Sequence, residues 1–354
     1  MSDKIISRNS SIELLRILAT FGVLILHYND EGLGGAFYYV TPHSINEFIL
    51  YFLVYLSIVS VNVFILISGY YLSKNNTRKI LKPLKLIVQV VLISFAFYVI
   101  NKIFINNDSF ADFFNKWCAV FWFVSLYIAL YLVSPYINII FNKLNNKQTK
   151  VFILILFFVF SVEPTLIDLL DSFTDCHLSF FSFISNAGSI DGYSIVNMVL
   201  MYSLGAFIRR NTDLIRKYSA SLYFLIYLLC VCINSLLSFV STIANSYCSP
   251  TVILEAVMIF CFFVKQKPFS SSVINMTARN AFSVYLSHVF LFRFMMVQTY
   301  VNASAPVMIL HVIITCLILY LIGWIIGQVY SIITDPVFSF LQKRINFYKY
   351  DTGD

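Results

Sequence analysis

Apolar residues run along this chain in long stretches that alternate with short polar segments. A helix that spans a bilayer needs roughly 20 mostly apolar residues, and ten stretches of this chain reach or approach that length. They cover residues 11–28, 48–72, 83–105, 117–141, 151–168, 194–208, 219–240, 249–264, 280–298 and 307–333. The pattern predicts an all-α polytopic membrane protein with about ten transmembrane helices.

The first stretch carries two ionisable residues, Arg16 and His27, which are eleven positions apart. At about 100° and 1.5 Å per residue, eleven steps turn roughly 20° past three full turns and rise roughly 16 Å. Both side chains therefore lie on one face of the helix, and Glu13 and Thr20 fall within about 60° of Arg16. A helix surrounded by lipid would not carry such a face, so we expect it to line a cavity or to contact a partner.

Composition and charge agree with this class and orient the chain. The chain is 59% hydrophobic and 12% charged, and its mean hydropathy is +0.81. Of the 24 Lys and Arg residues, 20 lie at the two termini or at the even-numbered connections, whereas the odd-numbered connections carry acidic residues such as Asp30. Because cytoplasmic loops retain Lys and Arg, both termini are predicted to be cytoplasmic. The net charge of +7 follows from the same rule and requires no nucleic-acid partner.

The chain shows no sign of an additional soluble domain. The longest segment outside the predicted helices, at about residues 169–193, is too short to form a domain core. We therefore expect residues 1–354 to form a single integral-membrane domain. No His, Cys, Asp or Glu spacing typical of a metal site occurs, so no metal cofactor is expected.

Arg16 and His27 suggest a chemistry as well as a location. Histidine is the side chain best suited to take a proton from a hydroxyl group near neutral pH, so His27 is a candidate general base. The Arg16 guanidinium, about 16 Å toward the cytosol, could bind a phosphate group bidentately, and an extended thioester-bearing arm would fit between the two. Alternatively, His27 is an interfacial histidine at a helix end, and Arg16 extends toward the headgroups with Glu13 as its partner.

A basic cluster precedes and begins the third predicted helix, and it includes Arg78, Lys82 and Lys85. Lys82 and Lys85 are three positions apart and share a helix face. Such a cluster is commonly an orientation signal or a binding site for anionic lipid. It is also a candidate second clamp on nucleotide phosphates, and the sequence leaves both interpretations open.

Several other polar and aromatic residues in the predicted helices are candidate site residues. Glu255 is the only acidic residue well inside a helix after the first, and we expect it to be paired, protonated or catalytic. His288 and Arg293 are about 140° apart around their helix and do not share a face; an ion pair between Arg293 and Glu255 is an alternative to a catalytic role. Trp122 and Tyr127 could stack on a sugar ring or simply pack. We take Trp122, Tyr127, His288 and Arg293 as candidate substrate contacts.

Four motifs occur in the order found in one family of membrane enzymes. They are Arg16 and His27 in the first helix, the sequence VFILISGY at 63–70, the segment from Trp122-Phe123 through Tyr131 to Pro135, and Tyr285-x-x-His288. Together they span most of the chain. With these motifs the chain resembles the membrane-bound acyltransferase family 3.

The resemblance implies transfer of an acyl group, usually acetyl from acetyl-CoA, to a hydroxyl group of a glycan or a lipid-linked sugar in the bacterial cytoplasmic membrane. It implies that His27 is the catalytic residue and that Arg16 contacts the donor. The basic pair of the family is Arg-x-x-Arg, whereas this chain has Lys82-x-x-Lys85, which lacks the bidentate fork. The motifs leave the acidic partner of His27 open, with Glu13 and Glu255 as candidates. The expected partners are acyl-CoA, the glycan acceptor and membrane lipids.

Two other functions fit a polytopic protein. A polysaccharide exporter or flippase without acyl transfer is the main alternative, because polar stripes in helix bundles also line conduits. A glycan polymerase would normally place its key charged residues in large outer loops, and here those loops contain almost no Lys or Arg. Specific binding of acetyl-CoA distinguishes an acyltransferase from an exporter.

Overall fold

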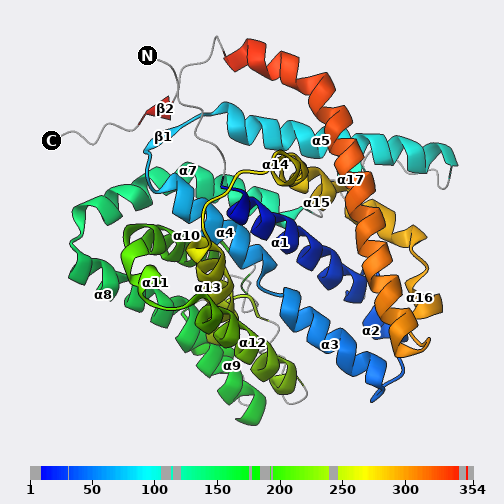
Figure 1. Ribbon diagram of the computed structural model, residues 1–354, viewed down its shortest axis with the longest axis horizontal. Helices are drawn as coiled ribbons and strands as arrows, with labels where there is room; N and C mark the ends of the chain where they lie inside the picture. The colour runs from blue at the N-terminus through cyan, green and yellow to red at the C-terminus, as the bar shows by residue number, and fades with distance from the viewer. Residues whose placement is uncertain are drawn as a thin grey trace.

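The computed structural model describes residues 9–30, 32–104, 113–114, 121–174, 178–183, 192, 194–238, 246–342 and 348–349. These residues form a bundle of helices (Figure 1). Within this part of the chain, the only strands are β1 (Thr77–Arg78) and β2 (Tyr348–Lys349), which form one short antiparallel pair. The predicted all-α class is confirmed.

Seven helical segments in the described ranges are long and apolar enough to span a membrane. They are α1 (Ser10–Asn29), α3 with α4 (Ile45–Ser57 and Ser60–Leu72), α5 (Leu81–Phe104), α7 (Trp122–Lys143), α8 with α9 (Asn146–Phe157 and Glu163–Thr174, joined by the π-helix η2, Phe158–Val162), α12 (Ala220–Leu237) and α17 (Ala305–Gln342). Each of them overlaps one of the predicted stretches, so the prediction of a polytopic membrane protein is confirmed.

The three remaining predicted stretches form shorter helices, and the count of ten spanning helices is not confirmed. The helices α10 (Ile195–Arg210) and α13 (Pro250–Lys265) have 16 residues each, and α15 (Ala281–Leu291) has 11. At about 1.5 Å per residue, 16 residues cover about 24 Å, which is less than the roughly 30 Å of a hydrocarbon core. Each of the three packs against another helix, α10 on α4, α13 on α12 and α15 on α17, so neighbouring helices cover part of their surface.

Short helices and capped turns connect the long segments. The short helices are α2 (Ala36–Tyr39), η3 (Leu178–Phe181), α11 (Thr212–Lys217), α14 (Ser272–Arg279), η6 (Phe292–Phe294) and α16 (Val297–Tyr300). Asn9 caps α1 by accepting a hydrogen bond from the backbone N–H of Ser11, and Asn145 with Gln148 forms a capping box at the start of α8. Such caps satisfy the free N–H groups of a first turn, so these helices begin where a polar residue precedes the apolar stretch.

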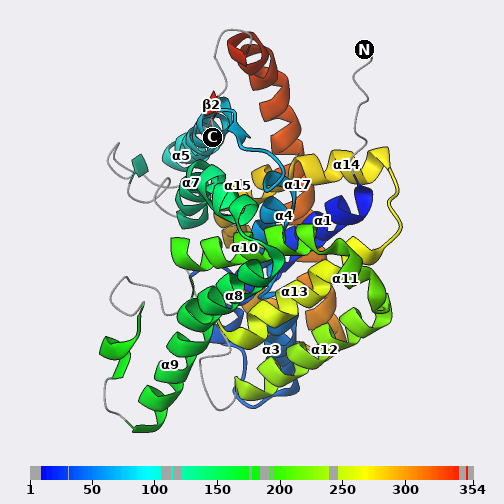
Figure 2. The same cartoon turned by 90° about the vertical axis from the view of Figure 1, so that its left-hand side faces the viewer.

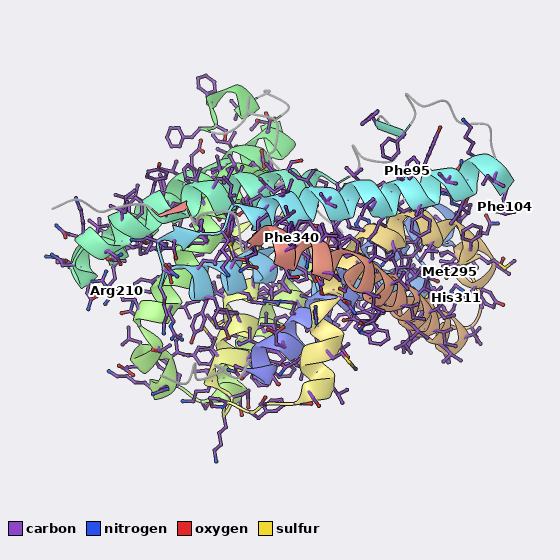
Figure 3. The ribbon with its side chains drawn as sticks, turned by 90° about the horizontal axis from the view of Figure 1, so that it is seen from above. Phe95, Phe104, Arg210, Met295, His311 and Phe340 are labelled. Carbon is purple, nitrogen blue, oxygen red and sulfur yellow. The ribbon has the colours of Figure 1, made fainter. Side chains whose placement is uncertain are left out.

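The polar face of α1 lies inside the protein. Of an 18-residue apolar stretch in each segment, 56% is buried in α1 and 61% in the α3–α4 segment, compared with 17% in the α8–α9 segment. Figure 2 accordingly shows α1, α4 and α10 in the middle of the bundle, with α9 and α12 toward its edges. The helix α5 is peripheral, and its residues Phe95 and Phe104 are exposed on the outside (Figure 3). Central helices and lipid-facing helices are thus clearly separated.

Several glycines allow close contacts between helices. A Cβ atom on Gly69 of α4 would lie 2.1 Å from the carbonyl oxygen of Tyr202 in α10, and one on Gly205 of α10 would lie 2.3 Å from the backbone of α4. On α17, a Cβ atom on Gly323 would lie 2.6 Å from the Cα atom of Val284 in α15. Small residues let helix backbones approach one another in membranes. These contacts fix the positions of the short helices α10 and α15.

The described ends of the chain lie at the same end of the bundle (Figure 1). The strand β2 pairs with β1, which belongs to the connection between α4 and α5. At the start of α1, the N–H of Ser10 donates a 2.9 Å hydrogen bond to the carbonyl of Phe269, in the connection after α13. The connection between α4 and α5 contains Lys74, Arg78 and Lys79, and the connection after α13 contains Lys267 directly after Lys265. We call this end of the bundle the basic end.

Candidate active site

A cavity of about 760 Å³ lies between α1, α4, α5, α7 and α15. The α1 side of its wall consists of Arg16, Thr20, Val23, His27 and the capping residue Asp30, with Leu26 beside them. Apart from Leu26, these residues recur every three or four positions, which places them on one helix face. Arg16 and His27 therefore face the same cavity, as their spacing predicts. Its volume is in the range of small-molecule binding sites.

Asp30, which directly follows α1, contacts His27 at the end of the cavity away from the basic end. Its Oδ2 atom lies 3.2 Å from Nδ1 of His27, and its Oδ1 atom accepts a 2.7 Å hydrogen bond from the backbone N–H of Gly32. The hydrogen bond with His27 lowers the pKa of Asp30 from its ordinary value of 3.8, because it favours the charged carboxylate. With Nδ1 directed at Asp30, Nε2 is the His27 nitrogen that remains for a substrate.

The turn after α1 holds the Asp30 carboxylate in place. The backbone N–H of Gly34 donates to the carbonyl of His27 at 2.9 Å, and that of Gly35 donates to the carbonyl of Asp30 at 2.7 Å. A Cβ atom on Gly34 would lie 2.3 Å from the carbonyl oxygen of Tyr28, and Gly35 has a φ of +75°. Both positions therefore require glycine, and the sequence Gly-Leu-Gly-Gly at 32–35 lets the chain fold back on the end of α1.

His288, on α15, lies beside His27. The two ring centroids are 4.8 Å apart, and the ring planes are inclined by 35°. His288 is fully buried and is one of the residues around the same cavity. Its ring packs near those of Tyr285 and Phe292, and the contact of Gly323 with Val284 holds α15 against α17. The fold thus brings two imidazoles from distant parts of the sequence to one place.

Three cationic side chains line the cavity toward the basic end. They are Arg16 of α1, Lys82 of α5 and Arg279 of α14. An Nη1 atom of Arg16 lies 3.2 Å from Oε2 of Glu13, which is 7% exposed. The Nζ atom of Lys82 lies 3.5 Å from the hydroxyl oxygen of Tyr127. Cations held in this way are suited to bind phosphate groups.

Aromatic side chains form much of the remaining wall. Phe64 comes from α4, Trp122, Phe123 and Tyr127 come from α7, and Tyr285 comes from α15. The rings of Phe123 and Tyr127 are stacked, with centroids 5.9 Å apart. Aromatic faces of this kind can pack against an alkyl arm or against the apolar face of a sugar ring. The cavity therefore has a cationic end, an aromatic wall and an imidazole–carboxylate end.

Comparison with known protein families identifies the chain. Residues 9–328 match the model of a family that is described as an acyltransferase domain. The chain belongs to the acyltransferase family 3. The predicted resemblance is confirmed, and the protein is a membrane acyltransferase. No curated protein and no solved structure matches the chain.

Two residues that we predicted to contact the cofactor of this acyltransferase lie outside the described cavity wall. Arg78 is 2% exposed, and its guanidinium donates to the hydroxyl oxygen of Ser134 at 2.9 Å and to backbone carbonyls. Lys85 pairs with Asp335 at 2.5 Å, and Asp335 lies beyond the residues that the family model matches. Of the three predicted residues of the basic cluster, Lys82 is the one that the structure places at the acyltransferase cavity.

The remaining predicted site residues are divided between the cavity and other places. Trp122, Tyr127 and His288 line the cavity. Glu255 is buried in α13, where its Oε2 atom accepts a 2.8 Å hydrogen bond from Asn234 of α12. Arg293, in η6, donates a 2.9 Å hydrogen bond to Oδ1 of Asn101 in α5. Glu13 contacts Arg16, and it is Asp30 that contacts His27.

Sequence reasoning did not select Asp30, Arg279 or Tyr285 for this site. Asp30 stands with the acidic residues of the first outer connection, yet it follows His27 by three positions, a spacing that puts both on one helix face. That spacing was a usable signal. Arg279 cannot be told apart in the sequence from a charge that orients the chain. Tyr285 belongs to the motif Tyr285-x-x-His288, but the motif alone did not assign it to the cavity wall.

Proposed function

We propose that this membrane acyltransferase moves an acyl group, which we take to be acetyl, from acyl-CoA to a hydroxyl group of a cell-surface glycan or its lipid-linked precursor. The observation that supports this best is the shared cavity, with cations at one end and the pair of His27 and Asp30 at the other. We place the enzyme in the bacterial cytoplasmic membrane with both termini in the cytoplasm, and we treat residues 1–354 as one domain.

Arg16, Lys82 and Arg279 would bind the phosphate groups of the acyl-CoA donor. A guanidinium group can bind a phosphate bidentately, and a lysine supplies a point charge. Along a helix, the Cα atoms of Arg16 and His27 are about 16 Å apart, so an extended thioester arm can run along α1 from the cations to His27. Thr20 and Val23 line the path between them.

His27 would act as the general base. As the acceptor hydroxyl oxygen attacks the acyl carbonyl carbon, Nε2 of His27 takes the hydroxyl proton. The Asp30 carboxylate stabilises the imidazolium that forms, by the logic of an acid–histidine pair. When the tetrahedral intermediate collapses, the carbon–sulfur bond breaks, and the imidazolium returns the proton to the departing thiolate. The products are the acyl ester and free CoA.

The acceptor would enter from the end of the cavity that contains Asp30. Tyr127 contacts Lys82 and so borders the donor region. Trp122 precedes Tyr127 by five positions in α7, and because the fourth predicted span runs toward the basic end, Trp122 lies nearer to His27. We therefore propose that Trp122 stacks on the sugar ring of the acceptor.

The first test of this function is the O-acetylation of surface polysaccharide. A deletion strain would be complemented with the wild type, His27→Ala or Arg16→Ala, and the acetyl methyl signal of purified polysaccharide would be measured by proton NMR. We expect no signal from the deletion strain or from His27→Ala, and a reduced signal from Arg16→Ala. His43→Asn is the matched control, because His43 is exposed in a connection and asparagine tolerates its φ of +60°. A wild-type acetyl level from a normally inserted His27→Ala variant would contradict the assignment.

The second test separates an acyltransferase from a polysaccharide exporter. Purified full-length protein in nanodiscs would be titrated with acetyl-CoA. We expect saturable binding that Arg16→Ala weakens by about tenfold or more, because a charged hydrogen bond contributes about 1.5–3 kcal/mol. Arg216→Ala, at a residue whose side chain is 77% exposed on α11, is the control for loss of one positive charge. Absence of any specific binding would favour the exporter.

A further inference from the structure

Both ring nitrogens of His288 lack a hydrogen-bond partner within the described part of the chain. The backbone carbonyls of Val284 and Tyr285 lie nearby but do not meet hydrogen-bond geometry. The residue is 0% exposed and lines the cavity. Because buried polar groups in proteins are almost always hydrogen-bonded, a ring that faces a substrate cavity with two free nitrogens points to a ligand atom as its partner.

The surroundings of the two imidazoles differ in a way that assigns different roles to them. His27 has the Asp30 carboxylate at 3.2 Å from Nδ1, so a positive charge on the His27 ring is stabilised. His288 has no such carboxylate among the contacts of the described residues; its neighbours are the rings of His27, Tyr285 and Phe292. The cations Arg16, Lys82 and Arg279 face the same cavity. A second positive charge beside His27 would be repelled, so His288 stays neutral while His27 accepts a proton.

We propose that His288 donates a ring N–H to the carbonyl oxygen of the acyl group and stabilises the negative charge that develops there. The inference rests on the proposed acyl transfer. During attack, the electron pair of the carbonyl bond moves onto this oxygen, and it returns to form the carbonyl again when the carbon–sulfur bond breaks. A neutral imidazole is suited to this role because it keeps one N–H donor without changing its charge.

The distance between the rings fits this arrangement. In the proposed intermediate, the base His27 would lie about 2.8 Å from the attacking oxygen, and the hydrogen-bond donor His288 would lie about 2.8 Å from the carbonyl oxygen. Both oxygens are bonded to the same carbon. Base and donor must therefore be neighbours on the wall of one cavity. Rings with centroids 4.8 Å apart satisfy this requirement. His288 is also held rigidly, since α15 packs on α17 at Gly323, and a donor fixed in advance stabilises charge best.

The test measures acetyl transfer in inverted membrane vesicles, which contain the full-length enzyme and the endogenous acceptor. Radiolabelled acetyl-CoA is supplied, and both acetylated glycan and released CoA thiol are quantified for the wild type, His288→Leu and His288→Gln. We expect His288→Leu to lower kcat about 10²–10³-fold with little change in KM for acetyl-CoA, as for removal of one oxyanion donor. His288→Gln keeps an N–H donor, and we expect it to recover at least tenfold of that loss. Because an oxyanion donor does not carry the transferred proton, the pH–rate profile should keep its shape in both variants.

Three outcomes would overturn the inference. They are a kcat of His288→Leu within a factor of three of the wild type, an equal loss in His288→Gln, or a loss confined to KM for acetyl-CoA. His27→Ala in the same vesicles separates this failure from failure of the proposed function. If wild-type vesicles transfer acetyl and His27→Ala vesicles do not, the function stands whatever His288 does; if wild-type vesicles do not transfer acetyl, the proposed function itself fails.

Discussion

Replacement of Asp30 with asparagine removes the negative charge beside His27 and leaves the shape of the turn intact. The Oδ1 atom of asparagine can still accept the hydrogen bond from the N–H of Gly32, which in the wild type is 2.7 Å long. The lost interaction is the 3.2 Å contact with Nδ1 of His27, at a carboxylate that is 46% exposed. A hydrogen bond to a charged group contributes about 1.5–3 kcal/mol, and because solvent screens this one, we take the lower end. The rate should therefore fall about tenfold.

The pH dependence gives a second measurement on the same variant. The hydrogen bond from His27 holds the pKa of Asp30 below its ordinary value of 3.8, so the stabilising contact is complete above that value and is lost as the pH falls through the lowered pKa. Between about pH 5 and 8, therefore, Asp30 is charged and can stabilise the positive charge that His27 would carry during the proposed transfer. The rate deficit of Asp30→Asn should therefore stay near tenfold across this range and shrink only at a pH low enough to protonate the wild-type carboxylate.

The assay is the initial rate of acetyl transfer from labelled acetyl-CoA in inverted membrane vesicles, measured across this pH range. Asp213→Asn is the matched control, because its side chain is 94% exposed on α11, away from the described cavity wall. A rate within twofold of the wild type across this pH range would refute the role of Asp30 as the acidic partner of His27. Loss of the protein from the membrane fraction would instead indicate a structural role.

Other variants test the packing and the basic end. Gly323→Val places side-chain atoms against the backbone of α15, where even a Cβ atom would lie 2.6 Å from the nearest atom. We expect the free energy of unfolding to fall by about 1–3 kcal/mol, which would be measured as a lower Tm in detergent, and we expect kcat to fall as well. Arg78→Ala leaves buried carbonyls and the Ser134 hydroxyl without their hydrogen-bond donor. The Tm should therefore fall, while KM for acetyl-CoA in the folded fraction stays the same. A raised KM with a normal Tm would instead show that Arg78 binds acetyl-CoA. Asp335→Asn releases Arg279 from an ion pair of 2.6 Å, and KM for acetyl-CoA should fall by up to about fivefold at low ionic strength, an effect that added salt should remove.

The sequence was informative wherever a regular pattern extended through one helix. Apolar length located the long spans, and helix periodicity placed Arg16 and His27 on one face of α1. The apolar pattern did not show that the helices α10, α13 and α15 are shorter than the other predicted spans, because protein neighbours and lipid favour the same apolar residues. The spanning count was therefore less certain than the class.

Contacts between helices that are distant in the chain could not be predicted from the sequence. The proximity of His27 to His288 depends on how α15 packs on α17, which in turn depends on the absence of a side chain at Gly323. The difference between Lys82, which lines the cavity, and Arg78, which is bonded to Ser134, is equally invisible, since both are basic residues of one cluster. Residue type indicated which groups were costly to bury, but their partners are a property of the folded chain.

The polar face of α1 has a consequence for how the two substrates are kept apart. Its cation and its imidazole lie about half a bilayer from one another, so a nucleotide held at Arg16 and a sugar presented to His27 need never share an aqueous compartment. In the proposed reaction the two-carbon acetyl unit alone is passed from the cytosolic pool to the exterior. Transfer of this kind would be vectorial, and neither bulky molecule would have to cross the permeability barrier.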